Sequence, residues 1–435
     1  MTFIGLVLIP LCAILMLRAP QTVFYLMIAF TAFSSTAVVN LPGFTFGLQP
    51  WHLFSAALAI LFLVGVIRIP ASGHAAAITT LLAGFLIAIL LSIFAKAIES
   101  SVAISNFTQA AIAVDGLITA AMVAFFCSSE KRLLAALRVF VWSAVAVALW
   151  GIFQAACGYI GLPYPAWLFN NSISDSADMF AQSVGGIPRI SSVAVEPSFF
   201  ARYAVAGAGI ALVMADISSG RERFYYRAAA ALIVLTAIGS TSTSAYIGLV
   251  LLFALWIAMD VRRGWIAAIA ASGGLLLLAM VEPSFVTALW RMTGDKAASG
   301  SFYERFGSVL AALRLFGEHP LFGHGWDELA SYDVLSALLY HVGAVGWLSF
   351  LALCLYALIG GLPNGASAAA DDQFATRTAR LSIGLRAVFA CVLGVDAVSG
   401  ISYVAANLWV VLGLTLAVQG LQRQQALRWT SSPAT

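Results

Sequence analysis

The sequence has very little charge. Only 9% of its 435 residues are Asp, Glu, Lys or Arg, whereas 62% are hydrophobic. A soluble domain is roughly a quarter charged and about half apolar. The composition therefore excludes a soluble globular protein and indicates a polytopic membrane protein. The formal net charge of +3 also excludes the strongly basic surface expected of a nucleic-acid-binding protein.

Cysteine is scarce as well. The five cysteines lie in or beside apolar runs and lack the spacing of a metal site, so we expect small, buried core residues. They are Cys12, Cys127, Cys157, Cys354 and Cys391. The first apolar run, 4–17, has no basic start and no clear cleavage site, which favours a retained span over a signal peptide.

The long apolar runs predict an all-α fold, because lipid-embedded backbone is satisfied by helices or by closed barrels, and a barrel would show short alternating segments. We predict a polytopic transmembrane helix bundle of about 11–13 spans. The runs are 3–17, 22–40, 51–68, 76–97, 108–128, 133–157, 199–216, 226–239, 243–259, 264–281, 333–360, 382–400 and 403–421.

Basic residues fall on alternate connections, which orients the bundle by the positive-inside rule. They are Arg18, Arg68, Lys131, Arg132, Arg221, Arg223, Arg227, Arg262, Arg263, Arg377, Arg380, Arg423 and Arg428. We expect one transmembrane domain over 1–435, with the N-terminus outside and two long outward loops, 158–198 and 282–332. The second loop contains an amphipathic helical pattern at 301–316. The polar tail 422–435 is expected to be cytoplasmic and disordered.

The first loop ends in a concentration of charge that is unusual for this chain. Arg189 precedes Glu196-Pro197-Ser198, and Arg202 follows inside the next apolar run. Proline at a first helical turn, with an acid before it, is typical of a capped helix start. The alternative is an anion site, in which forked guanidinium groups bind phosphate oxygens.

The second loop offers further cations, Arg305 and Arg291. Arg305 is either an exposed residue of an interfacial helix or a second ligand for a diphosphate leaving group. Neither loop contains an Asp-x-Asp metal motif, which favours charge neutralisation by arginine over a divalent ion.

Residues 319–328 read His-Pro-Leu-Phe-Gly-His-Gly-Trp-Asp-Glu. They predict a tight turn that either packs on the outer face or presents His324, Asp327 or Glu328 as a base for an acceptor hydroxyl. The hydroxyl-rich turn 239–246 either satisfies helix-end backbone or contacts sugar. Candidate glycan or lipid contacts are Ser242, Ser244, Tyr246 and Trp326.

Four ionisable residues fall inside predicted spans and are functional candidates by default. They are Asp115, His341, Arg386 and Asp396. A buried structural pair of Asp396 with an arginine, or a packing role for His341, is the competing interpretation.

At these motifs the chain resembles the O-antigen ligase/polymerase superfamily of bacterial polysaccharide-assembly membrane proteins. The matching pieces are Arg189 with Glu196-Pro197-Ser198, 240–246, Arg305, 319–325 and 343–346. The resemblance implies a GT-C-like bundle in the bacterial inner membrane, with a periplasmic active face. It implies inverting glycosyl transfer from an undecaprenyl-pyrophosphate-linked oligosaccharide, without a nucleotide sugar. We expect no cofactor and no metal. Partners would be the bilayer and chain-length-regulator and flippase proteins.

Matching arginines imply pyrophosphate contacts at Arg189 and Arg305, assisted by Arg202 and Arg291. Ligases of the family that this chain resembles carry a His-Asn-like pair shortly before the Gly-x-x-Gly. At the matching position this chain has Ser331-Tyr332-Asp333 instead. That departure favours a repeat-unit polymerase over a ligase acting on lipid A core or protein. It leaves the base open among His324, Asp327, Asp333, Glu196 and His341. A transporter or flippase is the third possibility, although we find no internal repeat.

Overall fold

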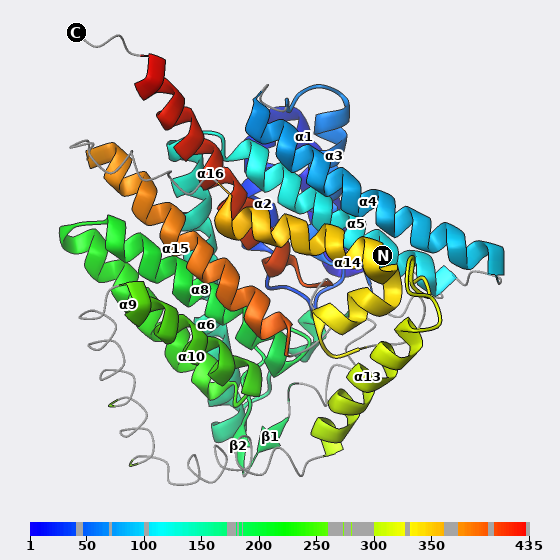
Figure 1. Cartoon of the computed structure of the whole chain (residues 1–435). Coiled ribbons are helices and arrows are strands. Elements are labelled where there is room, and N and C mark those ends of the chain that lie inside the picture. The colour runs from blue at the N-terminus through cyan, green and yellow to red at the C-terminus, as the bar shows by residue number, and fades with distance from the viewer. Residues whose placement is uncertain are drawn as a thin grey trace.

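The computed structural model describes residues 1–40, 47–68, 72–99, 104–171, 180, 182–184, 186–259, 273, 280, 300–326, 331–360, 373–398 and 404–431. Within these ranges the chain forms thirteen α-helices, one 3-10 turn and one two-stranded hairpin (Figure 1). The prediction of an all-α fold is confirmed.

The first helices are α1 (Phe3–Arg18), α2 (Pro20–Ala29), α3 (Pro50–Leu63), α4 (Gly73–Glu99), α5 (Ile104–Phe126) and α6 (Glu130–Ile160). The 3-10 turn η1 (Ala166–Leu168) and the antiparallel strands β1 (Ser183–Val184) and β2 (Ile187–Pro188) follow. The remaining helices are α8 (Pro197–Ile217), α9 (Gly220–Gly239), α10 (Thr243–Met259), α13 (Gly300–Phe316), α14 (Val334–Ile359), α15 (Gln373–Asp396) and α16 (Ala406–Ser431).

Six of the described helices are long and apolar enough to cross a membrane, and three more are shorter but apolar. The long ones are α4, α5, α6, α8, α14 and α15. The predicted span 22–40 is wrong, because α2 ends at Ala29 and the hydroxyls that follow bind backbone of another loop. The predicted span 264–281 lies outside the described residues, apart from Gly273 and Met280.

Two helices form the centre of the bundle. The first two-thirds of α16 and most of α8 are buried on all sides, as expected for helices that are apolar all round. α16 packs on α5 and α15, and α8 packs on α9 and α15. The five cysteines are all buried and free, as predicted.

The predicted disordered tail at 422–435 is wrong as far as Ser431, because α16 continues to that residue. Glutamine, leucine, alanine and arginine favour a helix, and elongating a helix that is already anchored in the core avoids the cost of nucleation. Polarity alone therefore did not end this helix.

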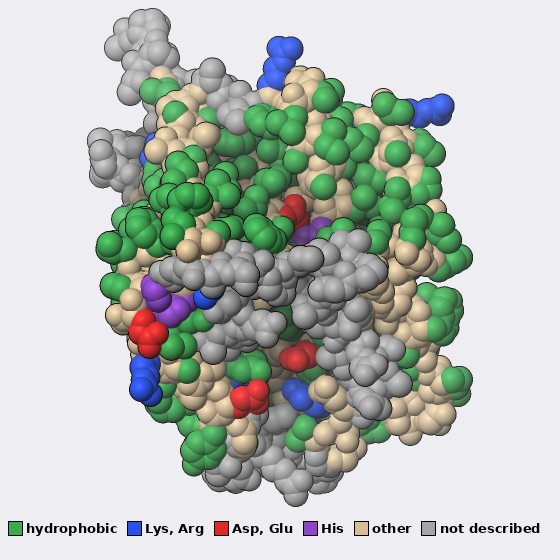
Figure 2. All heavy atoms as spheres, turned by 90° about the vertical axis from the view of Figure 1, so that its right-hand side faces the viewer, with side chains coloured by type: hydrophobic (Ala, Val, Ile, Leu, Met, Phe, Trp, Pro, Cys, Tyr) green, Lys and Arg blue, Asp and Glu red, His purple; other side chains and the backbone are tan. Residues whose placement is uncertain are grey.

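Polar contacts gather at opposite ends of the bundle. At one end, ion pairs of 3.3 Å join Glu130 to Arg377 and Arg138 to Glu222, which brings the starts of α6, α9 and α15 together. The hairpin β1–β2 and helix α13 lie at the other end (Figure 1). Figure 2 shows one face of the molecule, where a broad, mainly hydrophobic zone has Lys and Arg at its upper rim. Acidic side chains, His and further Lys and Arg lie around the middle of this face and below it.

Candidate active site

The segment between β2 and α8 is buried in the end of the bundle. Gln154, on α6, accepts hydrogen bonds from the backbone N–H groups of Ser191 and Ser192 at 3.0 and 2.7 Å, and its amide donates to Ser191 Oγ at 3.0 Å. A polar side chain inside an apolar helix is therefore used to fix a non-helical segment. Sequence reasoning missed Gln154, although an amide inside a predicted span was a usable signal.

A second pair of side chains fixes the same segment from the opposite direction. Ser35 Oγ donates to the Val193 carbonyl at 2.6 Å, and Ser34 Oγ accepts from the Val195 N–H at 3.0 Å. Ser34 and Ser35 lie directly after α2, where the sequence had predicted a continuous span. These bonds set the position of Glu196, the residue that precedes α8.

Arg189 reaches from this segment to the turn between α9 and α10. Its Nε donates to Thr241 Oγ1 at 3.1 Å and to the Ser240 carbonyl at 3.4 Å, and its Nη1 donates to Gln182 Oε1 at 3.2 Å. Burial lowers the pKa of Arg189; the charges of Glu196 and Tyr246 raise it, and the positive charge of Arg305 lowers it. Arg189 and Arg305, from different loops, thus act on each other electrostatically.

Glu196 occupies the N-cap position of α8, but its carboxylate makes no capping hydrogen bond. Instead, Oε2 accepts from Ser198 Oγ at 3.1 Å. The predicted helix start at Pro197 is therefore confirmed, whereas capping does not explain the carboxylate. Its charge acts on both Arg189 and Tyr332.

Arg305 lies on α13, the helix expected at 301–316. Its guanidinium lies 5.6 Å from the centre of the Tyr332 ring, a cation–π contact. The Tyr332 hydroxyl donates to Glu304 Oε1 at 2.9 Å. Burial is the largest cause of the raised pKa of Tyr332, followed by Glu304. Tyr332 was considered only as part of a departure from the family pattern, and its contact with Arg305 was not foreseen.

Arg202 forms a structural pair. It is 2% exposed, and its Nη1 lies 3.6 Å from Asp396 Oδ1 on α15. Its guanidinium also lies 4.2 Å from the centre of the Phe199 ring. The interpretation of Asp396 as a buried partner for an arginine is the one that the structure favours.

Helix α14 is broken at Gly343, where φ is +62° and ψ is −169°. The turn before the helix supplies the missing backbone partners. The N–H groups of His324 and Gly325 donate to the carbonyls of Tyr340 and His341 at 2.8 and 3.1 Å. Beyond the break, the N–H of Ala344 donates to Pro320 at 2.8 Å.

Glycine is required where these two backbones meet. Gly323 has a φ of +72°, and a Cβ placed there would come within 2.6 Å of the His341 carbonyl oxygen. Gly343 also has a positive φ and faces the Leu321 carbonyl. The motifs 319–325 and 343–346 are thus two halves of one backbone junction, which satisfies non-helical groups inside the bundle.

The two histidines of this junction have packing roles. His324 Nε2 lies 2.7 Å from the Leu315 carbonyl at the end of α13, and its ring stacks on Tyr340 at 4.9 Å. His341 is fully buried, with Nδ1 2.9 Å from the Gly325 carbonyl. Both rings therefore fasten backbone at the junction, which favours the packing interpretation for each.

Asp333 is the N-cap of α14. One carboxylate oxygen accepts from the N–H groups of Leu335 and Ser336 at 2.9 and 2.8 Å, and the other accepts from the hydroxyls of Ser331 and Ser336. These bonds occupy the carboxylate, as a cap requires.

Four predicted glycan or lipid contacts are mostly buried. Ser242, Ser244 and Trp326 are no more than 3% exposed, and the indole of Trp326 stacks on His341 at 4.9 Å. The Tyr246 hydroxyl lies 3.4 Å from the Ile238 carbonyl. This favours the helix-end interpretation of the turn 239–246. The other site candidates, Arg291, Asp327 and Glu328, lie outside the described residues.

The remaining ionisable residues within spans are also placed. Arg386 Nη2 donates to the Gly360 carbonyl at 2.8 Å, and Asp115 binds His52, a residue that the sequence did not single out. Among the described residues there is no group of three or more His, Cys, Asp or Glu side chains that could hold a metal ion.

Residues 228–346 match a family model described as O-antigen ligase. The match includes Arg305, the turn 319–325 and the first half of α14 up to and including its break at Gly343. It supports membership of the O-antigen ligase/polymerase superfamily. No curated protein matches the chain.

Proposed function

We propose that this chain, a multi-pass member of the O-antigen ligase/polymerase superfamily, polymerises oligosaccharide repeat units linked to undecaprenyl pyrophosphate. The observation that carries the proposal is that Arg189 and Glu196 from one loop and Arg305 from another act on one another electrostatically at one end of the bundle. Two like charges repel, and an anion bound between them offsets that repulsion. Guanidinium groups suit the oxygens of a diphosphate.

Arg189 is held ready for such a ligand. A guanidinium has five N–H donors, and the bonds to Thr241, Ser240 and Gln182 use the Nε–H and one Nη1–H. No bond within the described ranges uses the other donors, so these can bind phosphate oxygens. Arg305, fixed over Tyr332, supplies the second cation. Together they stabilise the charge that develops on the leaving diphosphate.

Glu196 is the described carboxylate that is best placed as the base. Asp333 is used as a cap, and the rings of His324 and His341 bind backbone carbonyls. In the proposed step, the acceptor hydroxyl loses its proton to Glu196 and its oxygen bonds to the anomeric carbon. The bond to the diphosphate breaks, and its electron pair leaves with the diphosphate, inverting the anomeric centre.

The transfer is tested with purified protein in nanodiscs and a lipid-pyrophosphate repeat unit. We expect a ladder of longer glycans that remain linked to the lipid, with release of lipid diphosphate. The family description favours a second candidate, a ligase. In a knockout strain, long chains accumulating on the lipid carrier would indicate that ligase, whereas single repeat units on the carrier indicate the polymerase. Translocation of the lipid-linked unit without any glycan growth would refute both.

A further inference from the structure

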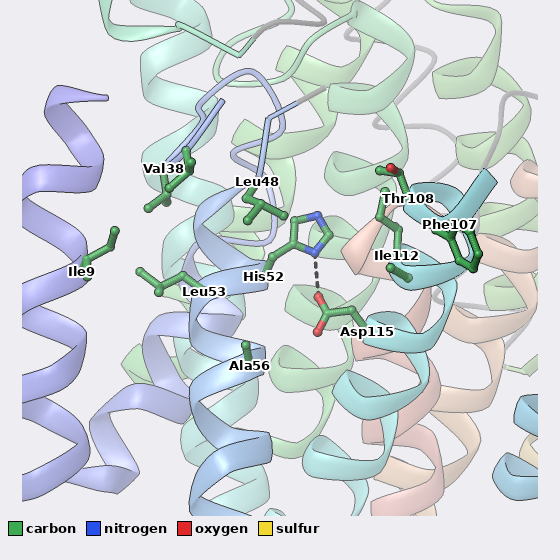
Figure 3. A pocket seen from close by; sticks show the side chains of 12 residues that line it. Ile9, Val38, Leu48, His52, Leu53, Ala56, Phe107, Thr108, Ile112 and Asp115 are labelled. Carbon is green, nitrogen blue, oxygen red and sulfur yellow. Dashed lines mark hydrogen bonds and ion pairs between the residues drawn. The ribbon is translucent and has the colours of Figure 1, made fainter. Parts of the chain in front are cut away.

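A cavity lies apart from the arginine site, between α1, α3, α5 and the residues Val38, Val39 and Leu48 (Figure 3). Its volume is about 530 Å³, within the range of roughly 300–1,000 Å³ for ligand pockets. Most of its lining is apolar, including Ile9, Leu53 and Ile112. It lies entirely outside the matched residues 228–346.

Two ionisable side chains line this otherwise apolar cavity. His52 Nδ1 lies 2.6 Å from Asp115 Oδ2, and the two side chains are 7% and 17% exposed. Figure 3 shows the pair between α3 and α5. A carboxylate only accepts hydrogen bonds, so Nδ1 carries a proton, and in the neutral form of the ring Nε2 is an acceptor.

The Nε2 atom of His52 is buried and has no hydrogen-bond partner within the described part of the chain. Native structures rarely leave a buried polar nitrogen unsatisfied, because its lost solvation costs about 1–3 kcal/mol. In a cavity large enough for a ligand, an unsatisfied ring nitrogen points to a ligand that forms a hydrogen bond with it, and a hydroxyl can donate or accept that bond.

The charge of the cavity restricts that ligand further. No Lys or Arg is among the described residues that line it, and the pair of His52 and Asp115 has no net positive charge in either form of the imidazole ring. A phosphate or carboxylate would therefore enter an apolar setting without a compensating cation. A neutral hydroxyl can donate to Nε2 without that cost.

The rim of the cavity is suited to entry from a lipid phase. Phe107 and Leu48, which line it, are 51% and 40% exposed. Exposed aromatic and aliphatic side chains at a cavity mouth favour an apolar chain over a polar solute. We propose that this cavity binds a neutral amphiphile, a long apolar chain ending in a hydroxyl that donates to His52 Nε2.

The test uses the full-length protein in detergent micelles and two photoreactive probes of equal chain length, a primary alcohol and its phosphate ester. Labelled peptides are mapped by mass spectrometry. We expect the alcohol to label α3 or α5, with competition by unlabelled alcohol, and at least about fivefold more labelling than by the phosphate.

Two substitutions separate the site from general lipid contact. His52→Phe removes the acceptor and keeps an aromatic ring, and Ala111→Phe fills the cavity. Each should reduce alcohol labelling about fivefold or more. His74→Phe is the matched control, because His74 is a part-buried histidine that binds Tyr356 and the Leu416 carbonyl instead.

The outcomes decide between the ligand classes. Equal labelling of wild type, His52→Phe and Ala111→Phe, with monodisperse protein in each case, would overturn the proposal. Stronger labelling by the phosphate would also overturn it. If His52→Phe does not fold, Ala111→Phe and the comparison of probes on wild type still decide.

Discussion

Arg189 should be the most sensitive charged residue of the arginine site. Arg189→Gln removes a guanidinium that binds Thr241, Ser240 and Gln182 through its Nε–H and one Nη1–H. These bonds leave its other N–H donors for the diphosphate. One charged hydrogen bond contributes about 1.5–3 kcal/mol, which corresponds to about tenfold to 150-fold in rate. We therefore expect kcat/KM for glycan transfer to fall by that factor.

Arg189→Lys tests geometry separately from charge. Lysine keeps the positive charge but lacks the planar fork, so the bonds that Nε and Nη1 make to the turn and to Gln182 cannot both be kept. We expect activity between that of wild type and Arg189→Gln. The same series at Arg305 should behave similarly, because both cations act on one diphosphate.

The assay is ladder formation from a lipid-pyrophosphate repeat unit, measured as initial rate at several substrate concentrations. Arg223→Gln is the matched control, because Arg223 also donates Nε to a carbonyl, that of Ser218 at 2.7 Å, but lies at the start of α9. Retention of more than half of the wild-type rate by Arg189→Gln, in folded protein, would refute the diphosphate site.

Three further substitutions test the scaffold by thermal unfolding. Gly343→Ala should lower the free energy of unfolding by more than about 2 kcal/mol, since φ is positive and a carbonyl blocks the Cβ. Its control is Gly65→Ala, which should cost only about 1 kcal/mol, because Gly65 has a φ of +76° but open space around the Cβ position. Gln154→Leu leaves two buried backbone N–H groups unsatisfied and should cost about 2–6 kcal/mol; no loss would contradict its role. The raised pKa of Tyr332 means that the folded state binds its proton more tightly, so its contribution to stability is present below pH 10 and is lost as pH rises above it. Tyr332→Phe should weaken that alkaline loss, and an unchanged pH profile would argue against the shift.

Hydropathy was enough to predict the helical class and the positions of most helices. The helix at 301–316 and the start of α8 at Pro197 were also predictable, because a helical stripe and a proline at the first turn are local signals. The error at 22–40 arose because Ser34 and Ser35 bind Val193 and Val195, contacts with no local signature.

The candidate site was only partly predictable. Arg189, Glu196 and Arg305 were found because charge is rare in this chain, but their partners Thr241 and Tyr332 come from other segments. Gln182 is near Arg189 in the chain, but only the hairpin β1–β2 brings the two side chains together. The junction at Gly343 could not be foreseen, because an apolar run with a glycine has the same sequence signature as a continuous span. Asp115 was flagged by its charge, whereas His52 became informative only once the fold brought the two together.

The broken helix has a consequence for biosynthesis. The turn 319–325 that completes the break precedes α14 in the chain, so it is synthesised before the carbonyls and N–H groups that it must satisfy. Chains emerge from the ribosome N-terminal end first. The backbone groups that satisfy the break are therefore already synthesised when α14 inserts. A circular permutant that starts at Val334 and places this turn last would reverse that order, and it should insert poorly even though its finished contacts are identical.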